Sequence, residues 1–380
     1  MDFELTEEQK MIRDMCRRFA ENEIKPVAAK LDETKEHPAE ICKKMGELGL
    51  MGIAIPEQYG GAGMDYVSYV LAVMEISRAC ASTGVIMSVN NSLYCFPIHT
   101  FGNHDQKVKY LTPVASGKAI GCYALTESGA GSDVASIRTT AELDGDSWVI
   151  NGEKKFVTNG NVASYCVLAA VTDKGKGYKG ISSFVFDTKN TPGFSVSRVE
   201  EKMGIRASGT AEMVFADARI PKENMLGERG AGMRQMLTTL DAGRLGIAAQ
   251  AIGIGRAVLE EALEYVKVRE QFGRPISRFQ AIQWKLADMA TELDAAELLL
   301  LRAAWLQGQG KPFEKESAMA KLYASDVTMR AAVEGVQMLG GYGYCKEFAM
   351  ERHMRDAKIC QIYEGTNEIM RLVISRALLK

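Results

Sequence analysis

The sequence contains 380 residues, of which 46 are basic and 48 acidic, so that its net charge is −2. A chain of this length favours two or three domains. The charge balance lacks the basic excess that is typical of proteins that bind nucleic acid. Hydrophobic residues make up 47% of the chain, which predicts a folded globular protein. There is no run of about 18 apolar residues, so we expect no membrane span.

The first residues, the cysteines and the histidines bear on compartment and metal binding. The N-terminus is acidic and passes directly into a helical pattern, without the basic start and apolar run of a secretory signal. The eight cysteines are scattered without a CxxC pair, which is typical of free thiols in a reducing compartment. The four histidines form no HExxH or i, i+4 pair, so we expect no metal site.

Residues 1–120 have helical periodicity and are predicted to form an N-terminal α-helical domain. Thr6 opens a capping-box pattern, after which apolar residues recur with helical spacing. We expect further helices after Pro38, after Asp65, which is a suitable N-cap, and near residues 106–115.

Residues 121–228 change to the alternating period of strands and are predicted to form a middle β domain. Strand patterns flank the turn Asp144-Gly145. The dipeptide Asn151-Gly152 is a strong short-range hairpin signal. Further strand patterns follow without helices between them, which favours an antiparallel sandwich or barrel.

Residues 229–380 return to helical patterns and are predicted to form a C-terminal four-helix bundle. The expected helices cover residues 233–269, 277–307, 317–339 and 366–379. Long helices with short connections favour a bundle. The predicted fold class is therefore α+β, with an antiparallel β domain between two helical domains.

Common nucleotide-binding and hydrolase motifs are absent from the sequence. It contains no GxxxxGK[ST] loop and no GxSxG elbow. Gly253 and Gly255 have the spacing of two Rossmann glycines, but they lie within a helical pattern, where close helix packing is the better interpretation. Any dinucleotide is therefore expected to bind in another way.

Two loops are candidates for a site. Residues 123–133, YALTESGAGSD, join the helical and strand zones and combine hydroxyl groups with glycines that let the backbone approach a ligand. Residues 361–368, QIYEGTNE, place Glu364 just before a helix that Thr366 or Asn367 can cap. The free N–H groups of that helix suit a phosphate, and a carboxylate in an apolar loop can have a raised pKa and act as a base. Taken singly, a plain loop and a capping or surface glutamate are the better interpretations.

Taken together, these loops and further motifs in the same order resemble the acyl-CoA dehydrogenase family from end to end. The further motifs are FVTN at residues 156–159, DAGR at 241–244, REQFG at 269–273 with Gln280, and QMLGGYG at 337–343. Residues 88–94, SVNNSLY, are especially similar to the short-chain (butyryl-CoA) members.

The resemblance implies FAD-dependent conversion of a short acyl-CoA thioester to the trans-2-enoyl-CoA. Glu364 would be the catalytic base that removes the α-proton, while a hydride passes from Cβ to flavin N5. The Glu364 N–H and a flavin ribityl hydroxyl would stabilise the enolate oxygen. Some relatives carry the base on the segment matching residues 241–244, but Ala242 and Gly243 cannot act as bases, which leaves Glu364.

The resemblance also implies which residues bind the cofactor and the substrate. Those expected to bind FAD are Tyr123, Leu125, Thr126, Ser132, Phe156, Thr158, Arg269, Phe272, Gln280, Gln337, Gly341, Thr366 and Asn367. Those expected to bind acyl-CoA are Ser132, Asp241, Arg244, Tyr363 and Gly365. For Asp241 and Arg244, the alternative is a surface i, i+3 ion pair.

A homotetramer, or at least a dimer, is implied as well, because part of each FAD site would come from a neighbouring subunit. The residues contributed in this way would be Arg269, Phe272, Gln280, Gln337 and Gly341. The usual partner of the family is an electron-transferring flavoprotein, and its usual role is the β-oxidation of fatty acids. The expected location is the bacterial cytoplasm, or the mitochondrial matrix if a transit peptide has been removed.

One departure from the family pattern concerns the substrate. The family usually has proline after Thr-Glu in the first loop, where this sequence has Ser128-Gly129. Gly129 adds backbone freedom, so a branched or alicyclic acyl-CoA stays open beside butyryl-CoA. The motifs are also compatible with a physiological enoyl-CoA reductase, with an acyl-CoA oxidase, and with an acyl-CoA binding module whose site is inactive. The intact Glu364 argues against the binding module.

Overall fold

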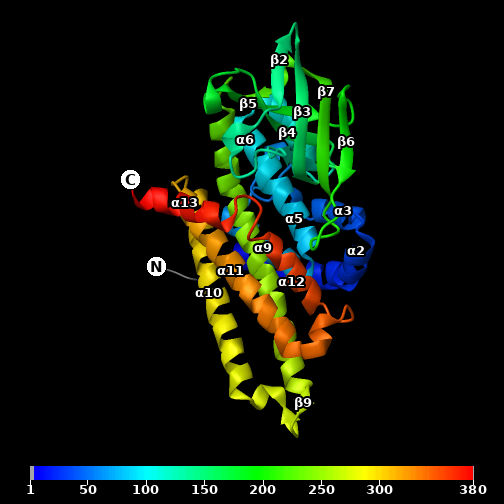
Figure 1. Ribbon diagram of the computed structural model, residues 1–380, viewed down its shortest axis with the longest axis vertical. Coiled ribbons are helices and arrows are strands. Elements are labelled where there is room, and N and C mark those ends of the chain that lie inside the picture. The colour runs from blue at the N-terminus through cyan, green and yellow to red at the C-terminus, as the bar shows by residue number, and fades with distance from the viewer. Residues whose placement is uncertain (1–3, 380) are drawn as a thin grey trace.

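The computed structural model describes residues 4–379, which form helices, then a sheet, then a helical bundle (Figure 1). The α+β fold class with a β domain between two helical regions is therefore confirmed. The helices before the sheet are α1 (Glu7–Phe19), α2 (Ala28–Thr34), α3 (Ala39–Glu47), α4 (Tyr66–Ala79), α5 (Ala81–Val89), α6 (Phe96–Phe101), α7 (His104–Gln106) and α8 (Thr112–Ala115).

Two of these helices begin as the sequence predicts. The Thr6 side chain accepts a hydrogen bond from the Gln9 N–H at 3.2 Å, and the Gln9 side chain accepts one from the Thr6 N–H at 3.0 Å, which completes the capping box of α1. Asp65 caps α4 by accepting the Ser68 N–H at 2.6 Å.

The segment from α5 to α6 is helical although periodicity predicts no helix there. Every residue of α5 is buried, so the segment has no polar face and no amphipathic period. A π-helical turn, Asn90–Cys95, joins the two helices. The Asn91 amide donates to the carbonyl oxygens of Leu50 and Met87 at 2.9 Å each, and the Asn90 side chain accepts the Gly121 N–H at 3.0 Å. The turn thus ties the helices to the sheet.

The middle of the chain forms an eight-stranded sheet in the order β6-β7-β3-β2-β4-β5-β8, with β1 paired to β4. Its strands are β1 (Gly121–Ala124), β2 (Thr140–Asp144), β3 (Ser147–Thr158), β4 (Tyr165–Val171), β5 (Ile181–Asp187), β6 (Phe194–Val199), β7 (Thr210–Pro221) and β8 (Met225–Leu226). Most pairs are antiparallel, as predicted, but β1–β4 and the single β2–β4 contact are parallel. Alternate residues of β1 face opposite sides: Tyr123 packs on the helices, whereas Cys122 and Ala124 face a second core within the sheet.

One hairpin prediction is confirmed and one is wrong. The turn at Asp144-Gly145 joins β2 to β3, with Asp144 opposite Ser147. Asn151-Gly152 forms no turn; it lies inside β3, at a shift of register against β7. A Cβ on Gly152 would lie 2.7 Å from Thr139 Cα, so this glycine permits close backbone contact at a bulge.

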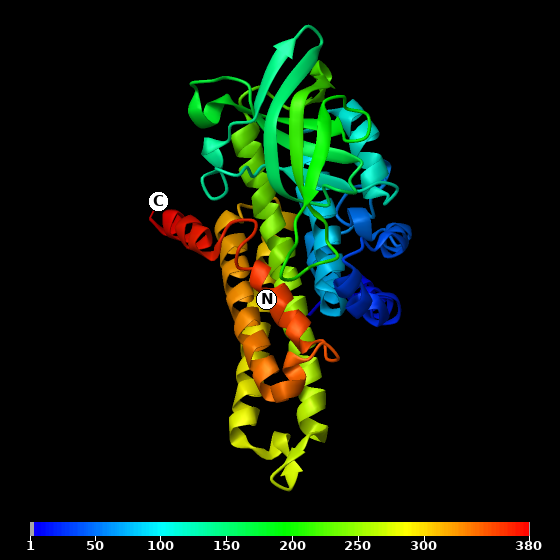
Figure 2. The same ribbon diagram turned by 45° about the vertical axis from the view of Figure 1, so that its right-hand side comes forward.

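The remaining elements form a long bundle that ends in a small hairpin. They are α9 (Gly232–Val268), β9 (Glu270–Gln271), β10 (Arg274–Pro275), α10 (Gln280–Gly308), α11 (Glu314–Leu339), α12 (Met350–Ile359) and α13 (Asn367–Leu378). The sheet lies at one end of the molecule and the β9–β10 hairpin at the other, in both views (Figures 1 and 2). In residues 4–379 no helix has the length and apolar character needed to cross a membrane.

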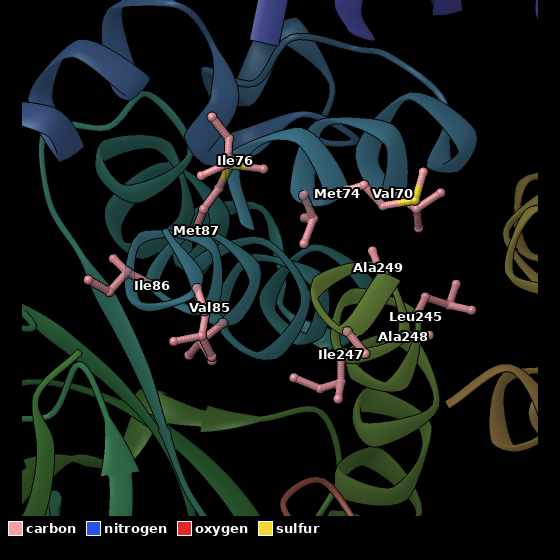
Figure 3. Close-up of a cluster of buried hydrophobic side chains, with 14 of the residues drawn as sticks. Val70, Met74, Ile76, Val85, Ile86, Met87, Leu245, Ile247, Ala248 and Ala249 are labelled. Atoms are coloured by element: carbon pink, nitrogen blue, oxygen red, sulfur yellow. The ribbon is translucent and has the colours of Figure 1, made fainter. Parts of the chain in front are cut away.

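Helix α9 joins the bundle to the first helical region. Its apolar side chains pack against those of α4 and α5, including Leu245, Val70 and Ile86 (Figure 3). A Cβ on Gly253 would overlap the Met74 carbonyl oxygen, and one on Gly255 would lie 2.5 Å from a Leu293 methyl carbon. Both glycines therefore serve close helix packing, which confirms that interpretation over a nucleotide loop.

Candidate active site

The loop between α12 and α13 holds Glu364 in an unusual backbone conformation. Glu364 has φ +53° and Gly365 has φ +97°. A non-glycine residue in the left-handed region is uncommon and tends to mark a functional position. Thr366 then caps α13, since its hydroxyl accepts the Ile369 N–H at 3.4 Å. The loop thus places one strained carboxylate beside a fixed helix start.

The carboxylate of Glu364 points at α9. Its Oε2 is buried and has no hydrogen-bond partner among residues 4–379. A Cβ on Gly243 would overlap this oxygen, so α9 needs a glycine here. Burial raises the pKa of Glu364 to about 8, although the cations of Arg244 and Lys321 act in the opposite direction. A carboxyl group whose pKa lies near neutrality is suited to take up a proton.

Side chains from two other helices hold this loop, and the sequence patterns do not single them out. Lys321 on α11 donates from Nζ to the Gly365 carbonyl at 2.7 Å and to Asn367 Oδ1 at 3.0 Å. The Tyr363 hydroxyl donates to Gln250 on α9, whose amide donates to the Ala81 carbonyl of α5 at 2.9 Å. Lys321 and Gln250 escape prediction, because each lies inside a long helical pattern that contains no motif.

Asp241 and Arg244 form a close ion pair on α9, near Glu364. Arg244 Nη1 lies 2.5 Å from Asp241 Oδ1, and the side chain of Arg244 is only 5% exposed. The interpretation as a surface pair is therefore wrong. Arg244 Nε is buried without a partner among residues 4–379, which leaves a donor for a ligand. Burial raises the pKa of Asp241 to about 6, against the influence of Arg244.

A small cavity of about 20 Å³ lies beside this part of α9. It is lined by Ala54, Ile55, Tyr66, Tyr69, Asn91, Ser92, Phe96 and Ala242. Asn91 and Ser92 come from the π-helical turn, and Leu93 of the same turn packs where a Cβ on Gly243 would lie. Aromatic side chains therefore line the space next to Ala242.

The loop after β1 is fixed to β3 by a buried ion pair. Lys154, which is fully buried, donates to the Leu125 carbonyl at 2.9 Å and to Glu127 Oε1 at 2.7 Å. The Thr126 carbonyl accepts the Lys155 N–H at 2.8 Å. The predicted residues Leu125 and Thr126 are thus held against the sheet, whereas Ser132 is exposed further along the loop.

Tyr123 connects the same strand to α9. Its hydroxyl donates to the Met236 carbonyl at 3.2 Å. Burial is the main cause that raises the pKa of Tyr123 well above its ordinary value, and the charge of Glu364 adds to it. Tyr123 and Glu364, which are 241 positions apart in the sequence, therefore lie within electrostatic reach of each other.

Phe156 and Thr158 lie at the end of β3. Phe156 has φ +58° at a register shift between Lys154 and Val157, and its side chain is 64% exposed. Thr158 is half-buried. A large aromatic side chain that is exposed on a strained backbone is a candidate surface for stacking with a flat ligand.

The remaining predicted residues lie at the far end of the bundle. These are Arg269, Phe272, Gln280, Gln337 and Gly341, around the β9–β10 hairpin and the end of α11. Arg269 lies over the Tyr342 ring at 5.7 Å, and Phe272 is 93% exposed with φ +53°. Within one chain this group is separated from the strand residues, which lie toward the opposite end (Figures 1 and 2).

Residues 4–379 contain no cluster of three or more His, Cys, Asp or Glu that is arranged to hold a metal ion. All eight cysteines are free thiols, and Cys345 is exposed.

Comparison with known proteins assigns all three parts of the chain to one family. The acyl-CoA dehydrogenase N-terminal domain matches residues 6–118, the middle domain matches residues 122–218, and the C-terminal domain matches residues 230–379. The short-chain specific acyl-CoA dehydrogenase of Clostridium acetobutylicum is 51% identical over 375 residues, which cover 99% of each chain.

Solved structures agree with this assignment over the whole length. Butyryl-CoA dehydrogenase from Megasphaera elsdenii is 44% identical, covers 100% of each chain and has a TM-score of 0.98. A chain from a structural study of the electron transferring flavoprotein of Acidaminococcus fermentans is 49% identical over 100% of each chain, with a TM-score of 0.99. The chain therefore belongs to the acyl-CoA dehydrogenase family, as its sequence motifs predict.

Proposed function

We propose that this protein is an FAD-dependent dehydrogenase that converts a short acyl-CoA thioester to the trans-2-enoyl-CoA. The observation that carries the proposal is Glu364, a buried carboxylate without a partner in residues 4–379, whose pKa burial raises to about 8. The similarity to a short-chain specific relative and to a butyryl-CoA dehydrogenase supports the reaction and the size of the substrate.

In the reaction, Glu364 removes the α-proton of the thioester and holds it on its carboxylate. Its backbone N–H has no acceptor among residues 4–379 and is free to donate to the thioester carbonyl, where negative charge develops. FAD, when bound, supplies the acceptor for the β-hydrogen as hydride. Arg244 offers its buried Nε–H to the substrate, and Asp241 orients that guanidinium. The burial of Glu364 Oε2 keeps water away from the base.

The residues that are present fit FAD. Phe156 offers an exposed aromatic face, and the loop of Leu125, Thr126 and Ser132 offers backbone and hydroxyl groups beside it. Thr366 and Asn367 stand at the start of α13, whose positive dipole end suits a phosphate, although the Asn367 N–H already donates to the Gln361 carbonyl at 3.1 Å. We assign these residues, together with Tyr123 and Thr158, to the flavin of their own chain.

The other predicted FAD residues are assigned to the flavin of a neighbouring subunit. Arg269 can bind a phosphate through two N–H groups, and Phe272 is exposed to a partner. Trp284 and Trp305 on α10 are also 62% and 50% exposed, which suits a surface covered by a second copy. We therefore propose a homotetramer. The likeness to the chain studied with an electron transferring flavoprotein supports such a flavoprotein as electron acceptor.

Two features support a short, unbranched acyl chain. The cavity beside Ala242 is small, about 20 Å³, and Tyr66, Tyr69 and Phe96 are among its lining residues. The departure at Ser128-Gly129 lies on an exposed loop, where a Cβ on Gly129 would meet nothing within 4 Å. It therefore changes the surface of the loop rather than this cavity.

We keep residues 1–120, 121–228 and 229–380 as the proposed domains.

The test is anaerobic titration of the FAD-loaded protein with acyl-CoA thioesters of four to eight carbons, linear and cyclic. Butyryl-CoA is expected to bleach the flavin absorbance fastest. Glu364→Gln should retain FAD and lose at least about a thousandfold in the rate of bleaching, because no base remains. Glu368→Gln, an exposed glutamate on α13, is the matched control and should react normally.

Two results would contradict the proposal. A Glu364→Gln protein that still bleaches at the wild-type rate would remove the base assignment. A wild-type protein that binds no flavin, or that binds acyl-CoA without bleaching, would favour a binding module. Peroxide formed in stoichiometric amount during aerobic turnover would instead identify an oxidase.

A further inference from the structure

Lys321 is a fully buried lysine in the interior of α11. Its ammonium donates to two neutral oxygens, the Gly365 carbonyl and the Asn367 amide oxygen, and no carboxylate of residues 4–379 forms a direct ion pair with it. An unpaired buried charge costs considerable free energy, and lysine is almost never fully buried unless paired. An apolar residue would fill this position of the helix more favourably if packing alone mattered.

The charged groups around Lys321 come from each element packed against it. Burial lowers the pKa of Lys321 to about 8, and the charges of nearby side chains also influence this pKa. The carboxylates that favour its charged form are Glu364 from the loop and Asp326 from α11, whereas Arg244 from α9 opposes it. The neighbouring Cys360 thiol is neutral at neutral pH, because burial raises its pKa to about 12. Asp326 is already bound by the Asn367 and Gln361 amides, at 2.7 Å each. Glu364 is the nearby carboxylate without a hydrogen-bond partner on Oε2.

Several titratable groups face Glu364 and influence its pKa. Two are cations, Arg244 and Lys321, and both favour the ionised carboxylate. The others are the phenols of Tyr69, Tyr123 and Tyr363, whose own ionisation Glu364 opposes. Arg244 is already paired with Asp241, so part of its field is compensated. Lys321 has no such partner in residues 4–379.

We propose that Lys321 is a positioning residue for the catalytic base: its ammonium fixes the Glu364 loop through Gly365 and Asn367, and its charge keeps the Glu364 carboxylate available in the ionised form. The inference rests on the proposed function, since it presumes that Glu364 is the base. The left-handed backbone at Glu364 and Gly365 is what allows the Gly365 carbonyl to meet α11 while the carboxylate faces α9.

The proposal has a chemical consequence. Burial places the pKa of Glu364 at about 8, so only a minor fraction of the base is ionised at neutral pH, and this fraction would fall further without a nearby cation. A nearby fixed cation lowers the proton affinity and raises the fraction of protein in which the base is free. Removing the cation should therefore shift the acidic limb of the reaction to higher pH by about one unit, which is about tenfold in rate at a fixed pH below the limb.

The experiment compares Lys321→Met and Lys321→Gln with the wild type. Both variants remove the charge, and glutamine keeps a hydrogen-bond donor for the loop. Ser325→Ala is the matched control, since Ser325 donates to the same Asn367 oxygen at 3.2 Å and its removal changes no charge. Lys174→Met, which removes a lysine from an exposed ion pair with Glu142, controls for net charge.

Two readouts are followed against pH. One is the rate of flavin bleaching by butyryl-CoA in stopped flow. The other does not depend on turnover: an infrared titration of the protonated carboxyl band of Glu364, identified by its loss in Glu364→Gln. Lys321→Gln and Lys321→Met should move both midpoints upward by about one unit, and the two control variants should leave both midpoints in place.

Each other outcome overturns the inference. Unshifted midpoints in both neutral variants would show that Lys321 does not act on Glu364. An equal shift in Ser325→Ala would assign the effect to loop disorder rather than to charge. Neutral variants that both fail to fold or to retain FAD would place Lys321 in the stability of the bundle. If the wild type itself is not bleached by butyryl-CoA, it is the proposed function that fails.

Discussion

At the scale of single residues, Glu364 links stability to proton uptake. Burial raises its pKa from the ordinary 4.5 to about 8, so the folded chain binds a proton that the unfolded chain releases above pH 4.5. Below pH 4.5 this bound proton makes its full contribution to the free energy of unfolding, and the contribution is lost as the pH rises to 8. The loss amounts to about 1.4 kcal/mol per pH unit across that window.

This linkage predicts the effect of Glu364→Gln on thermal stability. The variant cannot titrate at this position, so its Tm should exceed that of the wild type by an amount that grows between pH 5 and pH 8 and then stays constant. Thermal unfolding of both proteins in a series of buffers measures the difference. A difference that is the same at every pH would contradict the raised pKa.

Gly243 gives a second prediction at this scale. A methyl group at this position overlaps Glu364 Oε2 and lies 2.7 Å from a Leu93 methyl carbon. Gly243→Ala should displace the carboxylate and lower the rate of flavin bleaching by about a hundredfold, as small misplacements of a reacting group do. Gly308→Ala, where a Cβ meets nothing within 4 Å, is the control. Bleaching at the wild-type rate in Gly243→Ala would mean that the carboxylate does not occupy this position.

The sequence singles out the proposed base but not the residues that support it. Glu364 lies in a motif together with Tyr363 and Gly365, so it can be found by resemblance. Lys321 and Gln250 reach the loop from helices 43 and 114 positions earlier in the chain. Only the packing of those helices creates the contacts, and no local pattern records it.

At the scale of elements, the buried pair Lys154–Glu127 fastens the loop after β1 to the sheet. Removing one partner leaves the other charge buried without compensation, which typically costs about 3–5 kcal/mol. Lys154→Met should therefore lower the free energy of unfolding by about that amount and weaken FAD retention. The double variant Lys154→Met/Glu127→Gln should recover part of the stability.

Chemical denaturation and the flavin content after gel filtration measure these effects. Lys155→Met is the matched control on the same strand, because its ion pair with Glu212 is nearer the solvent and should contribute far less to stability. Equal effects of Lys154→Met and Lys155→Met would show that burial of the pair does not matter.

Elements differ in how far the sequence predicts them. The long helices α9, α10 and α11 are predicted within a few residues, because in each of them apolar residues recur with helical spacing over many turns without an interrupting proline. Helix α5 escapes prediction because it is buried on all sides. The dipeptide Asn151-Gly152 predicts a turn that does not form, because the same residues that permit a turn also permit a bulge within a longer strand.

At the scale of the whole molecule, two groups of predicted FAD residues lie apart within one chain. If both groups bind the same flavin, a second subunit must supply one of them. The residues near β1 and β3 and those around Arg269 lie toward opposite ends of one chain (Figure 1). If each flavin is bound by one group from each of two subunits, a monomer has two incomplete half-sites. The resemblance of the sequence to the family predicts such an assembly.

Complementation between two inactive variants tests it directly. Arg269→Ala should lose FAD binding at the site of its partner, and Glu364→Gln should lose the base of its own site. When the two are mixed and reassembled at random, about a quarter of all sites should contain both an intact base and an intact arginine. Recovery of about that fraction of butyryl-CoA activity is expected. No recovery, with mixed assembly verified by mass spectrometry, would place both residues in the site of one chain.

The π-helical turn Asn90–Cys95 should determine how well this part of the chain tolerates the insertion or deletion of a residue. A π-helical turn holds one residue more than an α-helical turn at the same place in the fold. Five residues of π-helix turn through about the same angle as four residues of α-helix, so deleting a single codon here would restore regular winding and leave the following helix in nearly the same orientation. Phe96 would then stay at the cavity wall. An added residue cannot be absorbed in this way, so a single insertion in this short stretch should be far more damaging than a single deletion, in contrast to the solvent-exposed loops of the sheet.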